Sequence, residues 1–106
     1  MSREERVARN EALFREVNER IKDVSAGTAS ETEFVCECGD AECTEPVSLT
    51  PVEYEEVRSD PTHFAILPGH VHPDIEVVIA RNERFAVVAK NDPQAARIAV
   101  REDPRS

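Results

Sequence analysis

The chain has 106 residues, of which 40% are apolar, and carries a formal net charge of −9 at pH 7. This length predicts a single domain, residues 1–106, with a small core, because only four Phe and one Tyr are available to fill it. No apolar run approaches the roughly 20 residues of a membrane span. The charged start, with no apolar segment behind it, is not typical of a signal peptide. We therefore expect a cytoplasmic protein with no membrane contact.

The negative charge is concentrated in one segment. Residues 31–60 contain ten acidic residues and one basic residue, whereas residues 1–30 and 61–106 each contain six of either sign. Such a segment repels a phosphate backbone, so we expect no direct binding of nucleic acid. Two interpretations stay open, a solvated acidic face and a surface that attracts a basic protein partner. The partner-binding residues would be Glu37, Asp40, Glu42 and Glu45.

Residues 1–24 predict an N-terminal amphipathic helix that begins near residue 3. Ser2 and Glu5 fit a capping box. With Asn10 filling one position, the apolar residues recur at alternating steps of three and four. The resulting stripe would dock on the domain's own sheet, or would pair with a partner or a second copy as a homodimer. Its members are Val7, Phe14, Val17, Ile21 and Val24, the first four being the expected helical contact.

The rest of the chain predicts short strands and helices. After a small-residue linker, residues 25–31, two strands at 32–36 and 46–49 form a hairpin. Thr50, Pro51 and Glu53 mark the start of a helix that ends before Pro61. Further strands are expected at 62–67, 75–79 and 85–88, the last two as a second hairpin, with a helix over 73–81 as the alternative. Residues 32–90 would form the core, and 91–106 a partly flexible tail with a short helix around 94–100 or none.

All three cysteines lie within eight residues, Cys36, Cys38 and Cys43, in the spacing C-x-C-x4-C. Gly39 and Asp40 provide a turn between them. Three thiols on one tight loop suit a metal that prefers sulfur ligands in tetrahedral geometry, with zinc first and iron second. In a reducing compartment these cysteines remain thiols. The sequence therefore predicts an α+β fold, a helix followed by a small antiparallel sheet, closed around a zinc knuckle.

A histidine is expected to complete this site. Pro68 and Gly69 form a sharp turn that would direct His70 at the cysteines, giving a Cys3His site. His72 is the alternative fourth ligand, and His63, inside a predicted strand, is the weakest candidate.

A family resemblance covers about residues 10–90. The resemblance rests on the segments Asn10–Ile21, Phe34-Val-Cys-Glu-Cys38, Cys43-Thr-Glu45, Leu49-Thr, Tyr54–Arg58 and Pro68-Gly-His70. These segments resemble a group of small bacterial proteins of the high-GC Gram-positive type. In similar sequences the histidine of Pro-Gly-His accompanies the three cysteines, so the resemblance implies that His70 is the fourth ligand. It implies no activity.

These observations predict a small zinc-binding protein whose metal is structural and stabilises a regulatory or protein-interaction module. Four protein ligands leave no position for water, so no catalytic residue is assigned. One alternative is an iron–sulfur redox protein, because the C-x-C start is similar to that of Cys3His iron–sulfur proteins. The other is a zinc-dependent hydrolase, in which Glu37, Glu42 or Glu45 would act as base if His70 does not bind.

Overall fold

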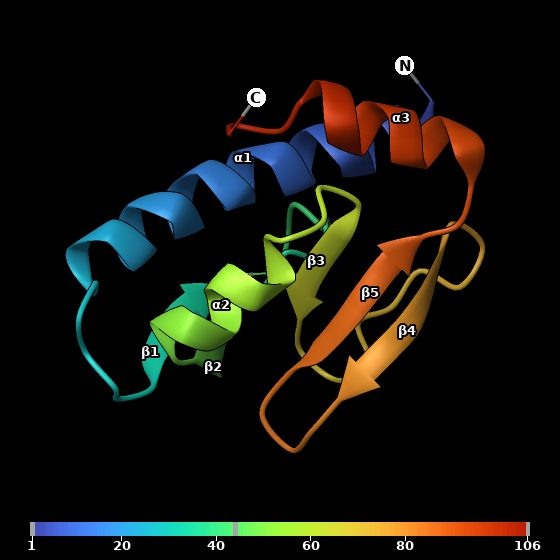
Figure 1. Ribbon diagram of the computed structural model, residues 1–106. Helices are drawn as coiled ribbons and strands as arrows, with labels where there is room; N and C mark the ends of the chain where they lie inside the picture. Colours follow the sequence, from blue (N-terminus) through green and yellow to red (C-terminus); the bar gives the residue numbers. More distant parts are fainter. Residues whose placement is uncertain (1, 44, 106) are drawn as a thin grey trace.

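The computed structural model describes residues 2–43 and 45–105 and has an α+β fold (Figure 1). Helices α1 and α3 lie side by side along one side of the molecule, and α2 lies near the first hairpin. None of the helices in the described ranges has the length and apolar character that crossing a bilayer requires. The elements in chain order are α1 (Arg3–Val24), β1 (Thr32–Val35), β2 (Pro46–Leu49), α2 (Pro51–Val57), β3 (His63–Ile66), β4 (Glu76–Arg81), β5 (Ala86–Lys90) and α3 (Pro93–Arg101).

Helix α1 begins where the sequence predicts but buries a different face. The Ser2 hydroxyl accepts a hydrogen bond from the Glu5 backbone N–H at 3.2 Å and caps the helix. The expected apolar stripe is wrong at Val17 and Val24, which are 42% and 88% exposed. Polar residues take the inward positions instead, because each finds a buried partner on another element. The buried residues of α1 are Val7, Ala8, Glu11, Arg15 and Asn18.

The first hairpin and α2 form as expected. Strands β1 and β2 pair antiparallel with Phe34 opposite Val47, and the cysteine loop lies between them. Thr50 accepts a hydrogen bond from the Glu53 backbone N–H, and the Glu53 carboxylate accepts one from the Thr50 N–H. This complete capping box starts α2 at Pro51. The first hairpin is thereby joined directly to a helix whose buried face covers it.

The second sheet has three strands in the order β3-β5-β4, all antiparallel. The predicted hairpin is confirmed as β4–β5, and the alternative helix over residues 73–81 is absent. The β4–β5 register shifts between Val78 and Ala80, which marks a β-bulge next to the edge of the sheet. Strand β5 lies in the centre, and β4 is an edge strand.

Both faces of β3 and β5 are covered, so the core has two parts. One face packs against the first hairpin and α2, and includes the stacked rings of Phe34 and Tyr54, whose centroids are 4.7 Å apart. The other face packs against α3 and the cysteine loop, and contains Phe64, Ile66 and Val88 beside Cys36 and Cys38. The cysteine loop is therefore part of the core and not an appendage to it.

The C-terminal segment forms the short helix that was expected around residues 94–100, where the alternative was no helix. Asp92 caps α3 by accepting a hydrogen bond from the Ala95 N–H at 2.9 Å. Beyond the helix, the carboxylate of Asp103 accepts a hydrogen bond from the buried Arg58 guanidinium. Packing thus extends past Lys90, where the core was expected to end. The inward residues of α3 are Ala95, Ile98 and Ala99.

Candidate metal centre

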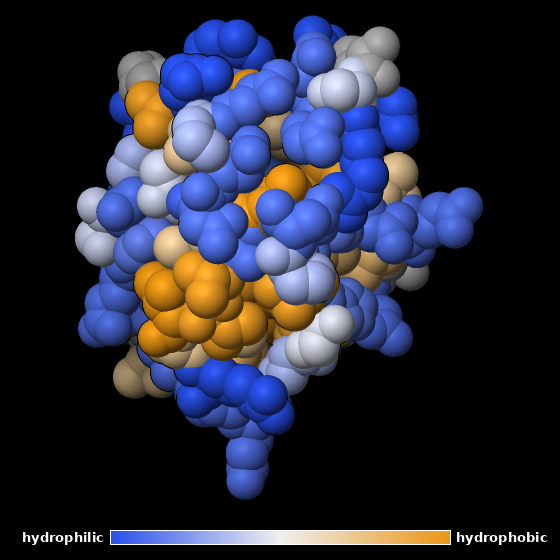
Figure 2. All heavy atoms as spheres, turned by 90° about the vertical axis from the view of Figure 1, so that its right-hand side faces the viewer, coloured by the Kyte–Doolittle hydropathy of each residue, from blue (hydrophilic) through white to orange (hydrophobic). Residues whose placement is uncertain are grey.

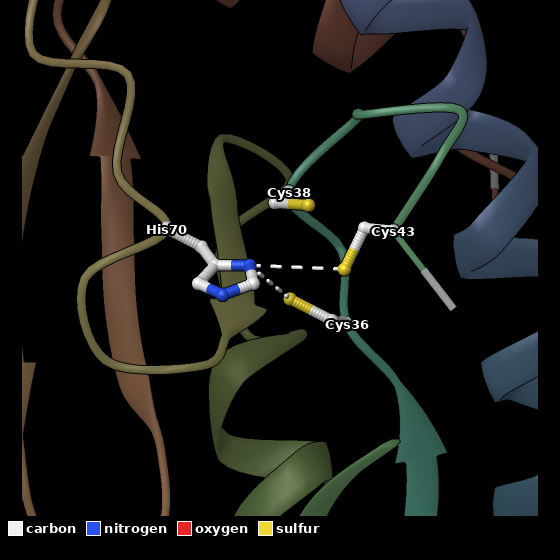
Figure 3. Close-up of side chains that lie close together, drawn as sticks. All are labelled: Cys36, Cys38, Cys43 and His70. Carbon is white, nitrogen blue, oxygen red and sulfur yellow. Dashed lines mark hydrogen bonds between the residues drawn. The ribbon is translucent and has the colours of Figure 1, made fainter. Parts of the chain in front are cut away.

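Four potential metal ligands from two separate loops lie together (Figure 3). The sulfur atoms of Cys36, Cys38 and Cys43 and a ring nitrogen of His70 all lie within 4.8 Å of one another. His70 Nδ1 is 3.7 Å from the sulfur atoms of both Cys36 and Cys43. The three cysteines are free thiols. The structure therefore brings together the Cys3His set that the sequence predicts.

The separations match what a single tetrahedral ion requires. With metal–sulfur and metal–nitrogen bonds of about 2.3 and 2.0 Å, a sulfur and a nitrogen ligand on a tetrahedron lie roughly 3.5 Å apart. The 3.7 Å distances from His70 Nδ1 to two sulfur atoms are close to that edge length. One ion can thus contact all four atoms with small side-chain adjustments.

The cysteine loop is shaped by a glycine and an aspartate. Gly39 has φ +78°, a conformation that suits glycine, and a Cβ there would lie 2.6 Å from Val7 Cγ1 of α1. The Asp40 carboxylate accepts a hydrogen bond from the Glu42 N–H at 2.9 Å, and the Asp40 carbonyl accepts one from the Cys43 N–H at 3.0 Å. The loop therefore turns tightly against α1 and directs Cys43 back toward Cys36 and Cys38.

The histidine is delivered by the turn after β3. Gly69 has φ +92°, and the His70 N–H donates to the Leu67 carbonyl at 3.1 Å. His70 Nε2 faces away from the thiols and lies 3.8 Å from a carboxylate oxygen of Glu45. At this distance the carboxylate makes an electrostatic contact and no hydrogen bond, and it places a negative charge on the outer side of the ring.

Backbone N–H groups lie beside the cysteine sulfur atoms. The Leu67 N–H donates to Cys36 Sγ at 3.2 Å. The backbone of Asp40 acts to lower the pKa of Cys38, and that of Glu45 acts to lower the pKa of Cys43. Such bonds stabilise thiolates, the form in which cysteine binds metal. The loop backbone is therefore arranged to hold negative charge on sulfur.

The thiols share their protons unequally. Hydrogen bonding, from the Cys36 thiol first, lowers the pKa of Cys38 to about 4 against the opposing effect of burial. The pKa of Cys36 is raised because its thiol donates to Cys38 and because it is buried. Burial also raises the pKa of Cys43. One thiolate is thus present before the other two ionise, and a cation would offset the repulsion among all three.

Glu37, expected on an acidic surface, is fully buried, and this is a correction. Its carboxylate accepts hydrogen bonds from Asn18 Nδ2 at 2.8 Å, from the Tyr54 hydroxyl at 2.6 Å and from the Ala65 N–H at 3.0 Å. Because it lies between Cys36 and Cys38 in sequence, these bonds fix the loop to α1, α2 and β3. Glu37 is therefore a positioning residue and is not available to a partner. The remaining acids of the expected face, Asp40, Glu42 and Glu45, are exposed.

The expected helical contact surface also changes. Val7 is 8% exposed and packs with Ile75 and Ala95, so it is not available to a partner. Ile21 is partly buried against the core, and Phe14 is half-buried. Of the four residues expected to form this contact, only Val17 is exposed.

His72, the alternative ligand, lies outside the group of four. Its Nε2 is 2.6 Å from the Cys38 carbonyl, and its Nδ1 is 3.1 Å from the Arg3 guanidinium. Because a carbonyl only accepts and a guanidinium only donates, Nε2 carries the proton and Nδ1 accepts. Both nitrogens are engaged, so His72 holds the loop and is not a fourth ligand. His63 lies elsewhere, 3.5 Å from Asp60.

Two further polar residues support the loop and were not foreseen. Asn18 donates to the Val35 carbonyl and to Glu37, and accepts from the Val35 N–H at 2.7 Å. Asn10, which fills one position of the expected apolar stripe, donates to the Gly39 carbonyl at 2.9 Å. The sequence signal for this role was that Asn10 and Asn18 lie near Glu11 and Arg15 on the helix, so that polar residues recur along one side of it. Hydrophobic periodicity does not detect such residues.

Comparisons with protein-family models, with curated proteins and with solved structures found no match to this chain.

Proposed function

We propose that this protein is a small zinc-binding protein in which the metal is structural. The observation that carries the proposal is the clustering of three cysteine sulfur atoms and His70 Nδ1 within 4.8 Å. Four protein ligands complete a tetrahedral shell, whereas a catalytic zinc keeps one position for water or substrate. Cys36 and Cys38 also lie inside the core, at 0% and 1% exposure, so an ion there joins parts of the core.

Zinc is favoured over an iron–sulfur cluster by the spacing of the ligands. A cluster of two or more irons spreads its ligands over several metal ions, so ligands on different irons lie farther apart than those on one ion. Here every ligand atom is within 4.8 Å of the others. A hydrolase is less well supported, because Glu37, one of its three candidate bases, is bound to Asn18, Tyr54 and the backbone.

Metal analysis of purified protein tests the proposal. We expect about one zinc per chain, no colour, and loss of metal in His70→Ala. His72→Ala is the matched control, because His72 lies two residues away and touches the loop without joining the ligand group. It should retain zinc. A brown protein with iron and labile sulfide would contradict the assignment of zinc, and equal metal loss in both variants would contradict His70 as the ligand.

The module would act through its acidic loop surface, Asp40, Glu42 and Glu45, by attracting a basic protein partner. Charge complementarity of this kind raises association rates and selects partners. All three residues are exposed. Arg84 forms its ion pairs with Glu31 and Glu53 and does not neutralise the acidic loop surface. These residues lie on the loop that carries the three cysteines, so the metal would hold the shape that the partner recognises.

Affinity capture from native cell extract tests this surface. Glu42→Lys should lose a specific basic partner while keeping metal and fold. Glu16→Lys makes the same change of charge at an exposed site on α1, and should retain the partner. Asp40 is left unchanged because its carboxylate shapes the loop, and Glu45 because its carboxylate lies beside His70. If both variants recover the same proteins as the wild type, the acidic loop is only a solvated face.

A further inference from the structure

The largest exposed apolar feature of Figure 2 lies over β4. Val77, Val78 and Ile79 are consecutive and are 47%, 40% and 50% exposed. Five of the six residues of the strand are exposed, so neither face of β4 is covered in the way that β3 and β5 are. In Figure 2 the patch is surrounded by hydrophilic side chains. An apolar patch with a polar rim on a small, highly charged protein marks an interaction site.

The patch coincides with an unpaired sheet edge. β4 pairs with β5 on one side only, so its other side presents free backbone N–H and C=O groups. Natural edge strands are usually protected by lysines, prolines or inward-pointing charges. β4 carries no lysine or proline, and its protection is limited to the inward-pointing Glu76 at its start and the bulge between Val78 and Ala80. The occupant of this surface is therefore a β-strand.

The register of β4 against β5 makes the strand complementary to itself. The bulge shifts the alternation by one residue, so Glu76 and Arg81 lie on one face of the sheet. By the same shift Val77 and Ala80 lie on the other face. When two β4 strands pair antiparallel with matching faces, Val77 of one copy lies opposite Ala80 of the other, and Val78 lies opposite Ile79. The Glu76 carboxylate is already bound to Lys90 and to the His72 N–H, so the apolar pairs are what favour such a ladder.

The surrounding charge also favours a second copy. The entire net charge belongs to residues 31–60, and the remaining residues hold twelve acids and twelve bases. In Figure 1, β4 is at the right edge of the molecule, away from β1 and β2. Asp74, which would approach Glu83 of the second copy, is already paired with Arg3 at 2.6 Å. Two copies can thus meet at β4 without bringing their acidic segments together.

We propose that the protein forms a two-fold symmetric dimer in which the edge strands β4 of two copies pair antiparallel, joining the three-stranded sheets into one six-stranded sheet. Such an interface uses the same patch on both copies, as closed dimers do. It brings Val77, Val78 and Ile79 of the two copies into cross-strand contact and completes the backbone hydrogen bonds of the edge. It leaves the acidic loop surface free.

Sedimentation equilibrium of the metal-loaded full chain tests the dimer. We expect the wild type to dimerise and Val78→Lys/Ile79→Lys to raise the dimer dissociation constant more than about tenfold, because lysines of the two copies then lie opposite one another and repel. Leu13→Lys/Val17→Lys is the matched control. It adds the same charge at two exposed apolar residues of α1, which are 57% and 42% exposed, and it should leave the dimer intact.

Hydrogen exchange locates the interface independently of any variant. Amides of β4 should exchange more slowly as wild-type concentration rises, while those of α1 should not change. Circular dichroism and metal content of the β4 variant establish that it is folded. A wild-type protein that is monomeric at all concentrations overturns the proposal. A dimer that is lost in the α1 variant but kept in the β4 variant also overturns it.

Discussion

Single buried polar side chains hold the metal loop in place. Glu37, between two candidate ligands, receives three hydrogen bonds from three different elements. Burial, first, and the neighbouring carboxylate raise the pKa of Tyr54, so its hydroxyl stays protonated and donates to Glu37. Because these groups have no access to water, each depends on its partner remaining in place.

Removing the Glu37 carboxylate should therefore be costly. Glu37→Ala leaves three buried donors without partners and should lower the free energy of unfolding by about 3–5 kcal/mol. Glu37→Gln keeps one acceptor oxygen and should cost less. Urea unfolding of the zinc-loaded protein measures both. Glu42→Gln, on the exposed side of the same loop, is the control and should stay within about 0.5 kcal/mol of wild type. Equal effects at both positions would contradict the role given to Glu37.

A second buried group predicts how stability depends on pH. Lys90 Nζ lies 2.6 Å from a Glu11 carboxylate oxygen and 2.5 Å from a Glu76 oxygen. Burial raises the pKa of Glu11 from 4.5 to about 8, although Lys90 lowers it. The folded state therefore holds a proton on Glu11 that the unfolded state releases above pH 4.5.

The sign of this effect follows from linkage. Stability from this site is greatest below pH 4.5 and falls as pH rises from 4.5 to about 8. The slope is at most about 1.4 kcal/mol per pH unit. Glu11→Gln does not titrate, so the stability of wild type relative to this variant should decline across that window. Urea unfolding of both proteins measures the difference, and metal binding, common to both, cancels. Parallel profiles would show that Glu11 does not titrate there.

At the scale of elements, the close contact between the cysteine loop and α1 depends on one glycine. Gly39→Ala would combine strain at φ +78° with a Cβ placed 2.6 Å from Val7 Cγ1 and 2.9 Å from the Val7 carbonyl oxygen. The helix backbone cannot move away without breaking the Asn10 hydrogen bond to Gly39. We expect a loss of about 2–4 kcal/mol and weaker zinc binding.

Gly27→Ala separates the effect of backbone strain from the effect of the contact with Val7. Gly27 has φ +92°, but a Cβ there meets nothing within 4 Å. This variant should lose only the strain, about 1 kcal/mol, and keep its affinity for zinc. Thermal unfolding and zinc competition assays compare the pair. If the two variants behave alike, the contact between the loop and α1 has no part in metal binding.

The elements were predictable where local chemistry specifies them. Thr50, Pro51 and Glu53 form a local capping motif that specifies the start of α2. The β-branched residues of β4 specify a strand. The inward face of α1 was not predictable, because Glu11, Arg15 and Asn18 are buried only by virtue of distant partners. Arg15, for example, donates to the carbonyls of Pro61 and His63 and stacks 3.8 Å from the Phe64 ring. Such contacts depend on the tertiary arrangement and leave no periodic pattern.

At the scale of the whole molecule, the metal would join the loop of the first hairpin to the turn that follows β3. Cys36 and Cys38 pack with Phe64, Ile66 and Val88 of the three-stranded sheet, while the preceding strand belongs to the first hairpin. The ligand set was predictable because spacing on one loop and a sharp turn before His70 are local features. The burial of Glu37 was not predictable, since an acidic residue in an acidic segment is expected to be exposed.

Removing the metal should therefore loosen the whole domain. Without a cation, three thiols whose ionisation is mutually opposed lie within 4.8 Å in and beside the core. Chelation should lower the free energy of unfolding by more than about 3 kcal/mol and broaden the amide resonances in the NMR spectrum. Added zinc should restore both the stability and the line widths. Cys38→Ser should reproduce the chelated state. An unchanged melting temperature after complete metal removal would show that the site is not structural.

The distribution of the ligands along the chain has a kinetic consequence. Three of them lie within eight residues, and the fourth follows Cys43 by 27 positions. An unfolded chain that already holds zinc through its cysteines needs only His70 to close that loop, which brings β1 and β3 together before their side chains pack. Refolding with zinc present should thus be faster than refolding of the apo chain followed by loading. The order in which a cell supplies metal and completes the chain would then determine how long the β4 edge stays exposed to other chains.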